Sequence, residues 1–324
     1  MSLSGWKSDA TALLGGMLLP LAFAPFGWWP IALLSLILFQ SVISQANVTR
    51  ALWRALLFGV GYFGIGVSWV YISISLFGNA TPLLAMAITL LYILVMSAYV
   101  VMTGFFVRRL GHSPVAMLWV LPVVWVIVEW LRSWLFTGFG WLSVGYAFID
   151  TPLAAYAPFI GVLGVSFLAV LTASFLYSLV GRSTNTIVRF VSAATIVIIW
   201  GVPMLFTFPV TTQADARAQS VALMQGNIPQ HIKWLISQRQ PTLDLYRGLT
   251  EQHWDKQLVI WPETAVPAYE DQVYDFLETL HTAAQLSGTS IILGVPVRES
   301  HGERYFNAMV VLGNSQRGPE SLYR

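Results

Sequence analysis

The sequence predicts a multi-span α-helical membrane domain followed by a smaller α/β domain. Of the 324 residues, 56% are hydrophobic and only 10% are charged, whereas about 25% of the residues in a soluble globular protein are charged. The charges are also unevenly distributed: residues 1–209 contain eight basic and three acidic residues, and residues 210–324 contain nine basic and twelve acidic residues. We therefore expect a transmembrane domain over 1–209 and a water-facing domain over 210–324, with the boundary after Phe208-Pro209.

Seven apolar segments in the first domain have roughly the length that a membrane-spanning helix needs, about 20 residues. The predicted spans are 9–25, 28–46, 52–77, 82–107, 115–136, 152–180 and 187–208. Charged residues or Pro and Gly separate them. The sequence therefore predicts about seven transmembrane helices.

The basic residues between these spans all fall on one side of the predicted membrane. They are Arg50, Arg54, Arg108, Arg109, Arg182 and Arg189. By the positive-inside rule this side is cytoplasmic, and Lys7 places the N-terminus there too. An odd number of spans then puts residues 210–324 on the periplasmic side of a bacterial inner membrane.

Two ionisable residues lie at membrane depth, near the outer end of the fifth predicted span. Glu129 and Arg132 are three residues apart on one helix face, where charged groups are costly and usually pair or face a cavity. We expect a structural ion pair, with direct substrate contact as the alternative. The glycine-broken aromatic segment 136–142 that follows suits a re-entrant or interfacial loop that touches lipid.

The second domain alternates between strand and helix patterns. Strands are expected at 220–225, 258–261, 291–295 and 306–312, and helices at 234–254 and 270–286. This alternation predicts an α/β arrangement.

Glu263 is the one residue for which the pattern suggests chemistry. It follows the apolar strand 258–261 and Pro262, at the carboxyl end of a strand, where side chains project into the crevice above a sheet. Withdrawal from water at such a place favours a carboxylate that acts as a general base. The alternative is an ordinary turn or helix-cap residue.

Residues 258–267 (LVIWPETAVP) resemble a segment of the apolipoprotein N-acyltransferases, whose outer domain belongs to the nitrilase superfamily. Further segments resemble the signatures of that family in the same order: 21–27, 69–73, 129–132, 137–141, 225–230 and 233–234. Together they cover nearly the whole chain. The resemblance implies that the α/β domain is a truncated nitrilase-like domain of the α-β-β-α class.

The resemblance also implies a two-step acyl transfer. In the family, a cysteine thiolate takes an acyl chain from a membrane phospholipid as a thioester, and the amino group of the diacylglyceryl-cysteine of an apolipoprotein then accepts it. Glu263 matches the family's general base, and Trp234 matches a tryptophan that contacts substrate, for which simple packing is the alternative. The implied partners are a phospholipid donor, an apolipoprotein acceptor and the lipid bilayer, with no cofactor.

The sequence departs from the family pattern at its end. The catalytic lysine and cysteine of the family follow a "YR" pair, whereas this chain stops at Tyr323-Arg324 and contains no cysteine. We therefore expect an N-terminal fragment of an acyltransferase that is inactive by itself, because losing a covalent nucleophile costs many orders of magnitude in rate.

Two other functions remain open at this stage. One is a membrane-tethered nitrilase-like amidohydrolase that acts on small amides, and the other is a non-catalytic remnant that binds lipid or lipoprotein. The five histidines show no ligand spacing, so no metal is expected. A net charge of +2 gives no reason to expect a nucleic-acid partner.

Overall fold

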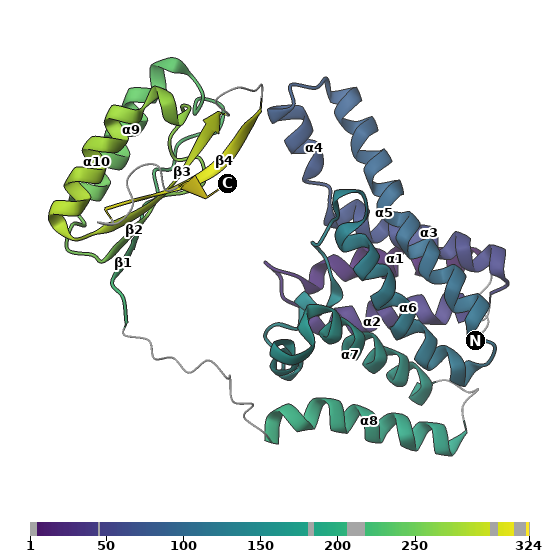
Figure 1. Ribbon diagram of the computed structural model, residues 1–324. Coiled ribbons are helices and arrows are strands. Elements are labelled where there is room, and N and C mark those ends of the chain that lie inside the picture. Colours follow the sequence, from purple (N-terminus) through teal and green to yellow (C-terminus); the bar gives the residue numbers. More distant parts are fainter. Residues whose placement is uncertain are drawn as a thin grey trace. The chain divides into compact units, whose positions relative to one another are not determined.

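The computed structural model describes residues 5–44, 46–180, 185–205, 218–298 and 304–313, and the backbone of 322–323. The chain divides into two units, Met1–Thr211 and Thr212–Arg324 (Figure 1). The boundary expected after Phe208-Pro209 lies in 206–217, outside the described residues.

The first unit is a bundle of apolar helices. They are α1 (Gly5–Leu18), α2 (Trp29–Ser44), α3 (Val48–Gly66), α4 (Val70–Ile72), α5 (Pro82–Leu110), α6 (Pro114–Trp134), α7 (Ala157–Val180) and α8 (Thr186–Leu205), with short 3₁₀ or π turns between several of them. This bundle identifies a multi-pass membrane protein.

Not every helix is long enough to cross a bilayer by itself. In the described ranges, four segments are long and apolar enough: Pro82–Leu110, Pro114–Thr137, Pro152–Val180 and Thr186–Leu205. A fifth results if Val48–Gly66 and Val70–Phe77, which meet at a 59° bend, form one span. Because α1 has 14 residues and α2 has 16, the expectation of seven spans stays a prediction.

The helix boundaries follow from local capping. Asn47 precedes α3 and its Oδ1 accepts a hydrogen bond from the Arg50 amide at 2.9 Å. Ser113 caps α6 in the same way through the Ala116 amide at 3.1 Å. Such side chains satisfy amides that have no partner in the first turn of a helix.

α3 packs against both α1 and α5, and glycines let the α1 and α3 backbones touch. A Cβ on Gly16 would lie 2.0 Å from the Phe58 carbonyl oxygen, and one on Gly61 would lie 2.4 Å from that of Leu13. Close approach through small residues is a usual way to pack helices in membranes.

The second unit is built on a mixed five-stranded sheet. Its strands are β1 (Val221–Leu223), β2 (Leu258–Ile260), β3 (Ser290–Arg298), β4 (Tyr305–Leu312) and β5 (Leu322–Tyr323), in that spatial order. β1, β2 and β3 run parallel, and β4 and β5 continue the sheet antiparallel. α9 (Ile236–Glu251) and α10 (Tyr274–Ser287) make the two crossovers.

The two faces of this sheet differ. α9 and α10 lie side by side over one face (Figure 1), where Val259, Ile291, Leu293 and Val310 are buried with Leu277 of α10. Alternate residues point to the opposite face because side chains alternate along a strand. On that face β1 and β4 expose apolar side chains, namely Val221, Leu223, Tyr305 and Met309.

Candidate functional site

Glu263 lies in the turn that leaves the carboxyl end of β2. The Trp261 amide donates to Ile292 O at 2.9 Å, and the Val266 amide donates to Gly294 O at 3.3 Å, so β3 holds the chain on both sides of the turn. The Ala265 amide closes the turn on Pro262 O at 3.2 Å. The backbone of Glu263 is therefore fixed against the central strand of the sheet.

Gly294 of β3 makes this close approach possible. A Cβ at this position would lie 2.5 Å from the Thr264 nitrogen and 3.0 Å from the Glu263 Cα. Thr264 itself has a φ of 50°, a left-handed conformation that a β-branched residue rarely adopts. A strained backbone is held here by its surroundings, as often happens at functional sites.

The Glu263 side chain is exposed, so the expected withdrawal of this carboxylate from water is wrong for this unit. Its Oε1 accepts a hydrogen bond from Asn307 Nδ2 at 3.2 Å. Asn307 is on β4, opposite Pro296 of β3. Asn307 was not among the predicted site residues, and its only local signal in the sequence is a polar residue inside an apolar strand.

A buried aromatic pair packs beneath the carboxyl edge of the sheet, on the face that α9 covers. The Trp261 indole is stacked on Tyr246 of α9, with ring centroids 5.0 Å apart, and its Nε1 donates to Thr250 Oγ1 at 2.9 Å. Burial raises the pKa of the Tyr246 phenol, while a hydrogen bond with the Gly226 backbone works in the opposite direction. The loops after β1 and β2 thus share one rigid support, at the edge where ligands bind in open α/β sheets.

Trp234 lies two residues before the start of α9, and 55% of its surface is exposed. Its neighbours Leu235 and Ile236 are exposed as well, at 50% and 84%. No hydrogen bond or ring contact between described residues joins Trp234 to Glu263. The structure therefore presents Trp234 as an open apolar surface and not as a packed core residue.

In the first unit, Arg132 holds the loop that follows α6. Its Nη1 donates to the carbonyl oxygens of Phe139 (3.1 Å) and Trp141 (2.6 Å), and its Nη2 donates to that of Leu142 (3.3 Å) and to Ser143 Oγ (3.4 Å). The residue is only 3% exposed. A buried guanidinium with several acceptors is the kind of group that can order an irregular backbone at membrane depth.

Glu129 holds the next residues of the same loop. Its Oε1 accepts from the Val144 amide at 2.7 Å and from Trp125 Nε1 at 3.2 Å. Among the residues described, no ion pair joins Glu129 to Arg132, so the expected ion pair between them is wrong. Both side chains instead bind the backbone of residues 139–144.

This loop, residues 138–145, is also bound from α3 and α7. The Tyr62 hydroxyl donates to Leu142 O, and the Gly145 amide donates to Ser166 Oγ at 2.7 Å. Around this rigid backbone, Phe136 and Trp141 expose 83% and 66% of their surfaces. The arrangement presents large aromatic side chains outward from fixed positions.

The described residues contain no group of three or more His, Cys, Asp or Glu side chains that could hold a metal ion.

In a comparison with known proteins, each of the two units matches a different protein family. Residues 15–175 match the apolipoprotein N-acyltransferase N-terminal domain family, and residues 220–324 match the carbon-nitrogen hydrolase family. The match to the second family confirms that the small mixed sheet is a nitrilase-like domain.

Similar curated proteins carry the same name. The chain is 40% identical to an apolipoprotein N-acyltransferase of Methylococcus capsulatus over 95% of this chain and 61% of that protein. The chain is 38% identical to the Coxiella burnetii protein of the same name, over 95% of this chain and 64% of that protein. It is 37% identical to the Vibrio cholerae protein, over 94% of this chain and 59% of that protein. The chain thus spans about three fifths of the length of the curated relatives it matches.

The two matched domains occur in one chain in this order, and the similarity to these relatives extends across both of them. The chain therefore belongs to the apolipoprotein N-acyltransferase family, within the nitrilase superfamily.

Proposed function

We propose that this chain contributes the membrane unit and the general base of an enzyme that transfers a fatty acyl chain from a membrane phospholipid to the diacylglyceryl-cysteine of an apolipoprotein. The supporting observation is the position of Glu263, on a turn pinned against Gly294 at the carboxyl edge of the sheet. A fixed backbone favours a base that must meet its proton donor in one geometry.

Glu263 acts as the proton carrier in both steps of this reaction. It first takes the proton of a cysteine thiol, whose thiolate attacks the phospholipid ester, and it returns the proton to the departing lysophospholipid. It then takes a proton from the attacking amine and gives it to the regenerated thiolate. Asn307 occupies Oε1, which leaves Oε2 as the oxygen that receives the proton.

The chain does not supply every group for this chemistry. It contains no cysteine, so the thiol lies outside these residues, and we propose that the chain is inactive by itself. Trp234 contributes a substrate-contacting surface, because its exposed indole adjoins the exposed Leu235 and Ile236 and suits an acyl chain or lipidated peptide.

We further propose that the protein lies in a bacterial inner membrane with the second unit on the periplasmic side. The support is the charge distribution: Arg50, Arg54, Arg108 and Arg109 gather where α2 and α5 end and α3 begins. Residues 138–145, at the other end of α6, contain no basic residue. Basic residues favour the cytoplasmic side.

The test is a chimera in which the remaining residues of the Methylococcus capsulatus relative follow Arg324. We expect it to release lysophospholipid and to transfer the acyl chain to a diacylglyceryl peptide. Glu263→Gln should lower thioester formation at least about 100-fold, the typical contribution of a general base. Glu278→Gln, which changes an exposed carboxylate on α10, is the matched control.

Two outcomes would contradict the proposal. One is normal thioester formation in the Glu263→Gln chimera. The other is hydrolysis of small soluble amides without any phospholipid requirement, which would indicate an amidohydrolase.

A further inference from the structure

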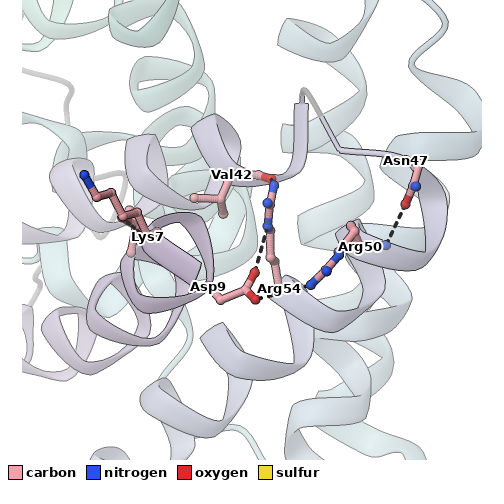
Figure 2. Close-up of polar contacts among 7 residues, drawn as sticks. Lys7, Asp9, Val42, Asn47, Arg50 and Arg54 are labelled. Carbon is pink, nitrogen blue, oxygen red and sulfur yellow. Dashed lines mark hydrogen bonds and ion pairs between the residues drawn. The ribbon is translucent and has the colours of Figure 1, made fainter. Parts of the chain in front are cut away.

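Positive charge is concentrated at one end of the helix bundle, where α2 ends and α3 begins. Arg50 and Arg54 of α3 both pair with Asp9 of α1, at 3.4 and 3.1 Å (Figure 2). One carboxylate therefore faces two guanidinium groups.

The two arginines have different environments. The Arg54 side chain is only 11% exposed, and its Nη1 donates to Val42 O at 2.7 Å, near the end of α2. A cation at the C-terminal end of a helix is favoured by the helix dipole, so Arg54 has a structural role that also uses Asp9. Arg108 makes a similar contact, from Nη1 to Ser44 O at 2.8 Å.

Arg50 is the accessible member of the cluster. Its side chain is 57% exposed, and its one ion pair is the longer of the two, at 3.4 Å. A guanidinium has five N–H donors in a planar fork that matches the oxygens of a phosphate. More than half of the Arg50 side chain is therefore accessible, and Asp9 pairs with Arg54 at the shorter distance.

The charge around this cluster is strongly positive. The described residues at this end include five basic residues, Lys7, Arg50, Arg54, Arg108 and Arg109, and Asp9 as the acid. Lys7 and Arg109 are exposed, and the Lys7 side chain points away from Asp9 (Figure 2). Asp9 neutralises only a small part of this charge.

Aromatic residues indicate what kind of anion meets this surface. Trp6 and Trp53 are 71% and 47% exposed, and each is adjacent in sequence to a basic residue, Lys7 or Arg54. Exposed tryptophans beside basic residues at helix ends are typical of the level of lipid headgroups. Binding of a soluble phosphate would not require exposed tryptophans beside the basic residues.

We propose that this end of the bundle, with Arg50 as the main ligand, binds the phosphate of an anionic phospholipid headgroup. Lys7 and Arg109 add long-range attraction, and basic clusters at the ends of transmembrane helices have this property in general. The surface shares no residue with the proposed base Glu263 or with the loop 138–145, which lies at the opposite end of α6 from Arg108 and Arg109. The proposal is therefore independent of the catalytic proposal.

The experiment uses the full chain in a neutral detergent and measures bound lipid by native mass spectrometry. We expect phosphatidylglycerol to be retained in preference to phosphatidylethanolamine, with a preference that weakens in high salt. Arg50→Gln should reduce the preference about fivefold, the effect of one basic residue near a membrane surface. Arg304→Gln, an exposed arginine of the second unit, should leave it unchanged.

Asp9→Asn provides a second variant with the opposite sign. Removing the counter-ion adds one net positive charge and frees Arg50, so the preference for phosphatidylglycerol should increase. Equal retention of both lipids by the unaltered chain would overturn the proposal, as would equal effects of Arg50→Gln and Arg304→Gln. Displacement of the lipid by millimolar inorganic phosphate would also overturn it, because that result indicates a site for soluble anions.

Discussion

The Asn307 amide of β4 donates a hydrogen bond to Glu263 Oε1 across 3.2 Å. The two residues are 44 positions apart in the chain, and β3 lies between their strands in the sheet. The contact ties the orientation of the proposed base to the β3–β4 pairing, and Asn307 is therefore a positioning residue for Glu263.

Asn307→Ala should slow thioester formation in the chimera by about tenfold, because one hydrogen bond to a charged group contributes roughly 1.5 kcal/mol. Both residues are exposed, so the free energy of unfolding should hardly change. Single-turnover acylation and a denaturant melt separate the two effects. Gln272→Ala removes an exposed amide elsewhere, and an equal loss of rate in that variant would exclude a specific role for Asn307.

Gly294→Ala should destabilise the second unit by about 1–3 kcal/mol, the usual range for overpacking a tight site. The new methyl group would lie 2.5 Å from the Thr264 nitrogen. Urea unfolding followed by tryptophan fluorescence measures the change. Gly248→Ala is the matched control: its Cβ meets nothing within 4 Å and it is in a helix, so that substitution should stabilise by about 0.5–1 kcal/mol. Equal effects of the two substitutions would contradict the close approach of the turn to β3.

Arg132→Ala should loosen residues 138–144 without unfolding the bundle. Four hydrogen bonds from the guanidinium are lost, so amide exchange in this segment should accelerate by at least about tenfold. Hydrogen–deuterium exchange with mass spectrometry provides the measurement. Arg109→Ala, at the other end of the bundle, should leave the segment protected, and unchanged exchange in Arg132→Ala would show that the loop is held by other contacts.

Glu129 should tolerate an amide but not an apolar side chain. In Glu129→Gln one carbonyl oxygen can still accept from both the Val144 amide and Trp125 Nε1, so the melting temperature in detergent should change little. Glu129→Leu leaves both donors unpaired, at a cost of about 1–3 kcal/mol each. Similar melting temperatures for the two variants would argue against the hydrogen-bonded role of this carboxylate.

The second unit should lose stability in alkali through Tyr246. Because burial raises the pKa of its phenol above the ordinary value of 10.0, the folded state binds this proton more tightly than the unfolded state. The corresponding stability is present below pH 10 and is lost as the pH rises through the folded pKa. Urea melts between pH 8 and 11 should show this slope, and Tyr246→Phe should reduce it; an unchanged slope would assign it to another group.

The sequence was most informative where the pattern is local. The expected strand 258–261 is observed as Leu258–Ile260, and the expected helix 234–254 as Ile236–Glu251. Apolar periodicity is a property of one segment, and it predicts such elements without knowledge of their partners. The membrane domain and the α/β domain could also be distinguished from the sequence, because the density of charged residues is a property of each segment by itself.

Contacts between distant segments were not predictable in this way. Glu129 and Arg132 were expected to pair because they share a helix face, but α6 ends at Trp134 and the chain turns back, which brings the carbonyl oxygens of residues 139–142 to the arginine. Similarly, the contact of Asn307 with Glu263 depends on the register of β4 against β3, which neither segment specifies alone.

The apolar sheet face that exposes Val221, Leu223, Tyr305 and Met309 has a practical consequence for anyone who produces the second unit separately. An exposed apolar patch can associate with other apolar surfaces, including the same patch on a second molecule. A shortened chain restricted to the region after α8 will aggregate as its concentration rises, so its handling calls for solubilising fusions or mild surfactant from the first purification step.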